Sequence, residues 1–191
     1  MKKQLFYLAL ILLTHVSCSK KIDALIKFNN GKELRGVFKS GGNKLKLLEN
    51  GKKYHIKDMK EITYFYDNYN VKYDIIDVKI YTDSKKSDRI LAYKVFDGNK
   101  INLYTTTESY QTGGSIGANF QGTINKAYIQ KKGEQFAYDI SYIHAIQHKG
   151  VKARLLEYFK DCPALIEKIK SKEINRHNAL KIAQFFEVSC N

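Results

Sequence analysis

Three cysteines are the side chains of this sequence best suited to chemistry, and their positions separate them into two groups. Cys18 lies near the N-terminus, whereas Cys162 and Cys190 lie close to the C-terminus. Disulfides persist in exported proteins, and once Cys18 is acylated or removed the other two make an even pair. The sequence therefore predicts a Cys162–Cys190 disulfide, which would contribute about 3–4 kcal/mol in the chain-entropy model. Two unpaired buried thiols are the alternative.

Metal and cofactor binding have weak support in the sequence. His144 and His148 are four residues apart, so a helix would place both on one face, but Ala145 stands where a zinc protease needs a glutamate. The two C-terminal cysteines lack the second pair of ligands that a closed zinc shell requires. The glycine-rich segment 113–117 lacks the Gly-Lys-Ser/Thr ending of a phosphate-binding loop. We therefore predict no metal site and no cofactor.

Pairs of acidic residues are the remaining candidates for catalysis. Asp74 and Asp77, and further on Asp83 and Asp88, lie in or near predicted strands. General acid–base catalysis needs two such groups in one pocket, and sequence spacing alone does not place them there. The segment 113–117, Gly-Gly-Ser-Ile-Gly, has the letters of the G-x-S-x-G nucleophile motif, but no helical pattern follows it as a nucleophile elbow requires. The sequence therefore assigns no catalytic residue and favours a protein that is not an enzyme, with an unrecognised envelope hydrolase as the alternative.

The N-terminus has the three-part pattern of an export signal. Lys2 and Lys3 precede an unbroken apolar run, Leu5–Leu13, and small or polar residues follow. The run is much shorter than the roughly 20 apolar residues that span a bilayer. We therefore predict an exported chain whose mature form has no transmembrane span.

The position of signal cleavage decides how the mature chain is anchored. The segment 15–18, His-Val-Ser-Cys, resembles a bacterial lipobox, although His15 stands where a leucine-like residue is usual. Cleavage before Cys18 would leave that cysteine as the acylated N-terminus. Ordinary cleavage, after Ser17 or Ser19, is the alternative. The predicted location is therefore periplasmic, secreted or lipid-anchored to the cell envelope.

The positive charge of the chain is concentrated in its first third. The formal net charge is +14, and residues 20–60 hold 12 basic and 4 acidic residues, a net +8. Only 4 of the 33 basic residues are arginine, the residue that bidentate phosphate and base recognition favours. Specific nucleic-acid binding is therefore disfavoured. An anionic envelope surface is the partner that this charge suggests, and a solvated lysine-rich exterior is the simpler interpretation.

Two stretches of short alternating strands precede a helical C-terminus. Residues 22–66 and 71–139 have strand patterns separated by turn signals such as Asn30-Gly31 and Asp97-Gly98. The tyrosines of the second stretch fit half-buried cross-strand packing, and a platform for a sugar or a peptide is the alternative. After Gly150 the apolar residues recur at helical spacing, with Asp161 as a candidate N-cap.

These patterns predict an α+β fold, with antiparallel β-rich N-terminal and middle regions and a C-terminal helical hairpin. The predicted divisions are a signal peptide (1–19), a basic small β-meander or barrel-like module (20–66), a second β-rich region (67–139) and a helical unit (140–191). Because Cys162 would begin one helix and Cys190 would end the next, antiparallel packing of the two helices would bring the cysteines together.

The segment Tyr158–Pro163, with the lysine-rich stretch that follows, resembles the C-terminal tail of uncharacterised exported, lipoprotein-like proteins from Bacteroidota-type bacteria. The segment Asn30–Gly36 is similar to the strand-turn-strand opening of those proteins, whereas Phe185–Ser189 departs from their usual ending. The resemblance implies export and this organisation, and it implies no activity. Together the features favour a non-catalytic envelope or secreted protein with a binding or structural role.

Overall fold

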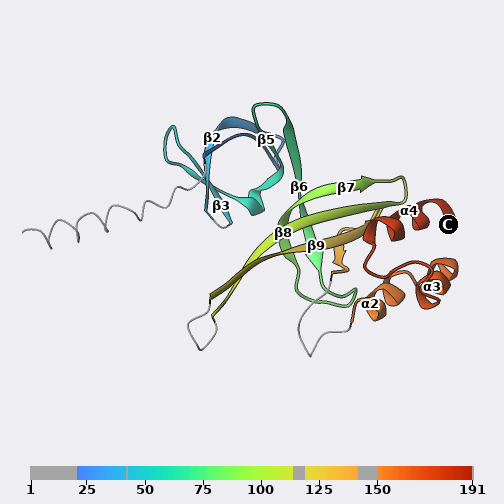
Figure 1. Cartoon of the computed structure of the whole chain (residues 1–191). Helices are drawn as coiled ribbons and strands as arrows, with labels where there is room; N and C mark the ends of the chain where they lie inside the picture. The colour runs from blue at the N-terminus through green and yellow to red at the C-terminus, as the bar shows by residue number, and fades with distance from the viewer. Residues whose placement is uncertain (1–20, 42, 114–118, 142–149, 191) are drawn as a thin grey trace, which may run out of the picture.

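The computed structural model describes residues 21–41, 43–113, 119–141 and 150–190, and the fold is α+β and rich in strands (Figure 1). Ten strands form one hydrogen-bonded sheet in the order β10-β9-β8-β7-β6-β5-β1-β2-β3-β4. The strands are β1 (Lys21–Phe28), β2 (Glu33–Gly41), β3 (Lys44–Leu47), β4 (Lys53–His55), β5 (Met59–Phe65), β6 (Asn70–Lys79), β7 (Asp88–Asp97), β8 (Ile101–Gly113), β9 (Asn119–Lys131) and β10 (Ala137–Asp139). The helical elements are the 3-10 turn η1 (Ile56–Asp58) and the helices α2 (Val151–Tyr158), α3 (Pro163–Lys170) and α4 (Ala179–Ser189).

Tight turns set the antiparallel register of the first strands. Gly31 and Gly51 have φ angles of +82° and +72°, a conformation that glycine adopts without steric cost. In each turn the preceding asparagine accepts a hydrogen bond from a backbone amide two residues on, as Asn30 Oδ1 does from the Lys32 N–H at 3.1 Å. The hairpin that Asn30-Gly31 predicts is therefore confirmed: it joins β1 to β2.

Strands β1 to β5 curl around a core of their own, seen end-on as the blue-to-cyan ring in Figure 1. Alternate side chains of each strand point inward, as the period of two requires. Buried aliphatic and aromatic residues fill this ring: Ala24, Ile26, Phe38, Leu45, Leu47, Met59, Ile62, Tyr64 and Ile75. Its lysines lie mainly on the exposed positions between them.

Strand β6 belongs to two packing units because its two faces meet different cores. Ile75 packs with the β1–β5 core, whereas its neighbour Ile76 packs in a second cluster with Val78, Ala92 and Tyr104. Strand β10 closes this second unit by pairing antiparallel with β9 and parallel with β6. The predicted division at residues 66 and 67 falls in the β5–β6 turn, and as a domain boundary it stays a prediction.

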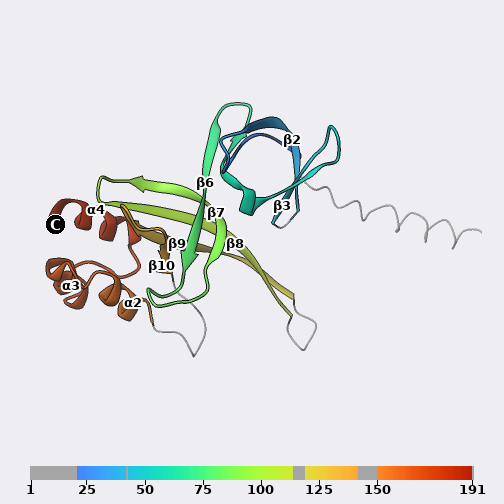
Figure 2. The same ribbon diagram turned by 180° about the vertical axis from the view of Figure 1, so that it is seen from behind.

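The three helices cover the outer face of β8 and β9, on the side away from the β1–β5 ring (Figure 2). Their apolar faces pack on Ile101, Leu103 and Ile129. Asn178 is the N-cap of α4, and its side chain accepts a hydrogen bond from the Lys181 amide. The N-cap expected at Asp161 is wrong: Cys162 occupies that position, because Asp161 binds Lys131 of β9 instead.

Several predicted features lie outside the described residues. These are the signal segment 1–19 with Cys18, the histidines His144 and His148, and most of the glycine-rich segment 113–117. Within the described ranges, every helix is too short or too polar to cross a bilayer.

Candidate functional site

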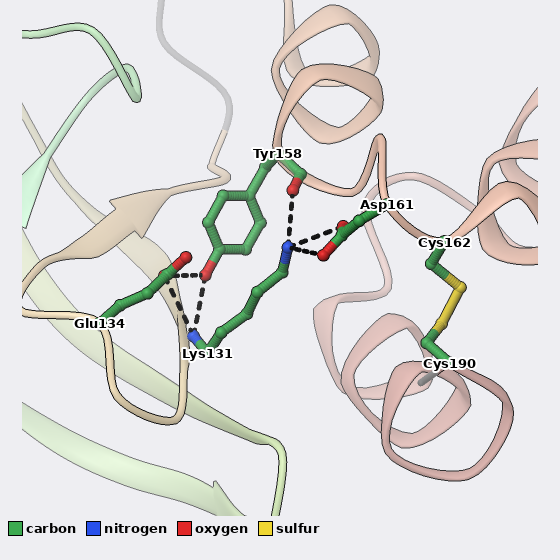
Figure 3. Close-up of polar contacts among 6 residues, drawn as sticks. All are labelled: Lys131, Glu134, Tyr158, Asp161, Cys162 and Cys190. Atoms are coloured by element: carbon green, nitrogen blue, oxygen red, sulfur yellow. Dashed lines mark hydrogen bonds and ion pairs between the residues drawn. A yellow bond between two sulfur atoms is a disulfide. The ribbon is translucent and has the colours of Figure 1, made fainter.

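The two C-terminal cysteines lie side by side at disulfide-bonding distance, with their Cα atoms 5.5 Å apart (Figure 3). Both side chains are buried in the core beneath the helices. Cys162 is the N-cap of α3 and Cys190 is the C-cap of α4, so the bond joins the start of one helix to the end of the next. The role of this cysteine pair is therefore structural: it links α3 to α4.

Next to the disulfide, a polar cluster of Lys131, Glu134, Tyr158 and Asp161 attaches α2 and the α2–α3 turn to β9 (Figure 3). The Lys131 ammonium lies 2.7 Å from Asp161 Oδ2 and donates to the Tyr158 carbonyl at 3.1 Å. The Tyr158 hydroxyl accepts from the Lys131 amide at 2.8 Å and donates to Glu134 Oε2. We call these four residues the Lys131 cluster.

The Lys131 cluster has the properties of a structural contact. The Lys131 ammonium lies 4.8 Å from the ring centre of Tyr158 and 5.4 Å from that of Phe186, so its position is fixed by aromatic faces as well as by Asp161. Burial, and then the hydrogen bond to Glu134, raise the pKa of Tyr158 far above its usual range, so its hydroxyl stays protonated. Each polar group of the cluster already has a partner, which leaves no reactive group directed at a substrate.

Asp74 and Asp77, the first of the acidic pairs considered for catalysis, are engaged in separate ion pairs. Asp74 lies 3.3 Å from the Lys94 ammonium, and Asp77 lies 3.2 Å from the Arg89 guanidinium. The two aspartates are three positions apart on β6, so their side chains point to opposite faces of the strand. Among the described residues, no three histidine, cysteine, aspartate or glutamate side chains gather as a metal site would require.

A cleft of about 900 Å³ lies between the β1–β5 ring and strands β6, β7 and β8. Its walls carry aliphatic side chains together with a set of hydroxyl groups. The hydroxyl-bearing residues are Ser40, Tyr64, Tyr73, Tyr93, Thr105, Thr106 and Thr107. A volume of this size, with apolar walls and a few polar groups, is typical of a ligand-binding site.

Three tyrosines from three different strands form one wall of the cleft. The rings of Tyr64 and Tyr73 meet edge to face with centres 5.5 Å apart, and Tyr73 meets Tyr93 in the same way at 6.0 Å. Burial, and to a smaller extent the neighbouring tyrosines, raise the pKa of Tyr64 to about 12 and raise that of Tyr73. Both hydroxyls are therefore neutral hydrogen-bonding groups at physiological pH. The cross-strand packing predicted for the tyrosines of residues 71–139 is confirmed for Tyr73 and Tyr93.

Arg89 is the one charged residue among the described residues that line the cleft, and both of its terminal nitrogens already donate hydrogen bonds. Its guanidinium pairs with Asp77 and also donates at 3.2 Å to Asn29 Oδ1 and to the Met59 carbonyl. Asn29 and Met59 belong to the β1–β5 ring, so Arg89 fixes β7 against that ring. The cleft consequently presents a neutral surface of rings, methyl groups and hydroxyls.

The cleft was not predicted from the sequence because no motif marks it. Its walls come from segments up to 67 residues apart, Ser40 to Thr107. The partial signal is the set of tyrosines, for which a binding platform stood as the alternative interpretation. No family model, no curated protein and no solved structure matches this chain.

Proposed function

We propose that this chain is an exported, non-catalytic envelope or secreted protein that binds a ligand in the cleft between the β1–β5 ring and strands β6 to β8. The observation that carries the proposal is the cleft itself, with about 900 Å³ of space and three tyrosine rings along one wall. Exposed aromatic rings in a recess supply large contact area at a small cost in side-chain entropy. Tyr93 is 45% exposed, so its ring is available for such contact.

The chemistry of the lining favours binding over hydrolysis. A hydrolase needs two titratable groups that converge on one bond. Arg89, the charged residue of the described lining, is held by Asp77, Asn29 and Met59 and offers no proton transfer. Neutral hydroxyl and aromatic groups bind and orient a ligand, and the described lining holds no carboxylate or histidine to act as a general base.

Export is part of the proposal and has its own test. The apolar run near the N-terminus, the cysteine pair at bonding distance and the high net charge support an oxidising location near an anionic envelope. Mass spectrometry of the protein from its native host should give an N-terminus at Cys18 with acyl chains, or a free amine after Ser17 or Ser19. Full-length protein in the cytosol would contradict export.

Binding in the cleft is tested with two variants of the same strand. The mature chain is screened against an array of bacterial envelope oligosaccharides and a phage-displayed library of random linear peptides. Tyr93 and Val95 are 45% and 43% exposed on β7, but Tyr93 lines the cleft and Val95 does not. For the best ligand, titration calorimetry should give at least a tenfold loss of affinity for Tyr93→Ala and less than twofold for Val95→Ala. Equal affinities in the two variants would refute the proposed site.

A further inference from the structure

The cleft opens between two strands that are paired at one end and separated at the other. The ladder of β7 with β8 runs from Asp97↔Asn102 to Tyr93↔Thr105 and goes no further. Strand β8 itself continues to Gly113, paired with β9 along its whole length. Figures 1 and 2 show the β8–β9 hairpin running on past the end of this ladder, away from β7.

The cleft reaches the edges of these two strands as well as their faces. Arg89, Ile90 and Leu91 are consecutive on β7, and Thr105–Thr107 are consecutive on β8, and all six line the cleft. Successive side chains of a strand point to opposite faces. A cavity that contacts three residues in a row must therefore approach the edge of the strand, where the backbone amides and carbonyls lie.

The direction of the β8 backbone groups follows from β9. Ala127 donates its amide to Ser141 Oγ at 2.7 Å, and its carbonyl accepts from the Ile140 amide at 2.9 Å. Both groups of Ala127 thus point away from β8, so the opposed pair Thr105↔Ala127 is not a hydrogen-bonded one. The backbone groups of Thr105 therefore point toward β7, and by alternation those of Thr107 do as well.

The same alternation orients β7. Thr105 faces Tyr93, so the backbone groups of Tyr93 point toward β8, and so do those of Leu91 two residues earlier. Within the part of the chain that the structure describes, no strand pairs with Leu91 on its β8 side or with Thr107 on its β7 side. The cleft is thus bordered by two strand edges whose donors and acceptors have no partner strand.

We propose that the ligand of the cleft is an extended polypeptide segment that adds as a β-strand to these edges. The inference rests on the proposed function and names its ligand class. Main-chain hydrogen bonds to Leu91 and Thr107 would hold the segment, and alternate side chains would contact the tyrosine wall. Since the described lining carries no uncommitted charge, the segment should be uncharged where it contacts the cleft.

The test uses a ten-residue synthetic peptide taken from the phage-displayed library described above. Nine further versions each carry one N-methylated backbone amide, one for each peptide bond, which removes a donor and leaves the side chains intact. Because a strand between the two edges directs its amides alternately to β7 and to β8, methylation at each of several consecutive positions should lower affinity for the mature chain at least tenfold. Positions outside this contacting run should change it less than threefold.

A variant of the protein tests the same hydrogen bonds by removing a donor from the cleft instead of from the peptide. Thr107→Pro removes the amide that points into the cleft and spares the β9 ladder, so it should weaken the unmodified peptide at least tenfold. If this variant does not fold, the methylation series on the wild-type chain decides alone. A series with no run of consecutive sensitive positions would overturn strand addition between the two edges. If only oligosaccharides bind, and Tyr93→Ala lowers their affinity, strand addition is overturned and the proposed function stands. If Tyr93→Ala changes the affinity of no ligand, strand addition and the proposed binding site are both overturned.

Discussion

The helix-covered face of the sheet and the cleft side differ in how their polar groups are used. Beneath the helices, the Lys131 cluster, the Cys162–Cys190 pair and the buried ion pair of Arg154 with Asp139 join segments that are distant in sequence. On the cleft side, two strand edges and a row of hydroxyls face open space. One face therefore stabilises the fold, and under the proposed function the other face binds the ligand. Substitutions beneath the helices should therefore change the free energy of unfolding and leave ligand affinity unchanged, and cleft substitutions should do the reverse.

The largest effect is expected at Arg154. The residues Arg154 and Asp139 are each 5% exposed, and the Arg154 guanidinium binds the carbonyls of Asp139 and Ser141 as well as the Asp139 carboxylate. Arg154→Met would leave a buried carboxylate without its counter-charge, so the free energy of unfolding in urea should fall by about 3–5 kcal/mol. The exposed Arg176, changed to Met, is the control and should stay within about 0.5 kcal/mol of wild type. A loss below about 1 kcal/mol for Arg154→Met would contradict this role.

The disulfide should have the next largest effect. The two cysteines are 28 residues apart, and closing a loop of that length stabilises the fold by about 3–4 kcal/mol in the chain-entropy model. Reductant should lower the melting temperature of the wild type. The double variant Cys162→Ala with Cys190→Ala should have a lower melting temperature than wild type, and reductant should not change it. An unchanged wild-type melting temperature under reducing conditions would mean that the bond does not stabilise the chain.

Lys131 and its neighbour Lys132 form a matched pair with different surroundings. The Lys131 side chain is partly buried between Asp161 and aromatic rings, whereas Lys132 pairs with the exposed Asp97 at 2.9 Å. Lys131→Met should cost about 1–2 kcal/mol, a range that allows for the solvent screening of Asp161. Lys132→Met should cost less than about 1 kcal/mol. Urea unfolding of both variants checks this order. The reverse order would contradict a stabilising role for the Lys131 cluster.

A smaller, pH-dependent effect is expected at Glu187 of α4. Its carboxylate accepts from the Lys100 amide at 2.9 Å and the Asn99 amide at 2.7 Å in the β7–β8 turn. These hydrogen bonds, that of Lys100 first, lower the pKa of Glu187 below its ordinary 4.5. The stabilisation is therefore present above about pH 4.5 and is lost as the pH falls through the lower folded-state pKa.

The measurement for Glu187 compares melting temperatures at two pH values. Glu187→Gln should melt below wild type at pH 7, and the difference should shrink at pH 3. The exposed Glu167 of α3, changed to Gln, should show no such pH-dependent difference. A difference for Glu187→Gln that is the same at both pH values would show that its contacts do not depend on charge.

The sequence predicted local features of the fold well and the cleft poorly. Asn30-Gly31 marks its hairpin because a two-residue turn has strict backbone requirements. The cysteines could be paired because helical periodicity placed them at the two ends of adjoining helices. Tyr64, Tyr73 and Tyr93 carry no such local mark, since they meet only through the registers of β5, β6 and β7. The separation of β7 from β8 depends on the curvature of the whole sheet, so no short segment encodes it.

Amide hydrogen exchange at Leu91 and Thr107 tests most directly whether the separated edges of β7 and β8 bind the ligand. In the mature chain alone, these two amides should exchange faster than those of Ala92 and Thr106, which point toward β6 and β9. With saturating peptide from the phage-displayed library, Leu91 and Thr107 should become at least tenfold slower while Ala92 and Thr106 change little. Slow exchange at Leu91 and Thr107 without peptide, or no change when peptide is bound, would contradict strand addition at these edges.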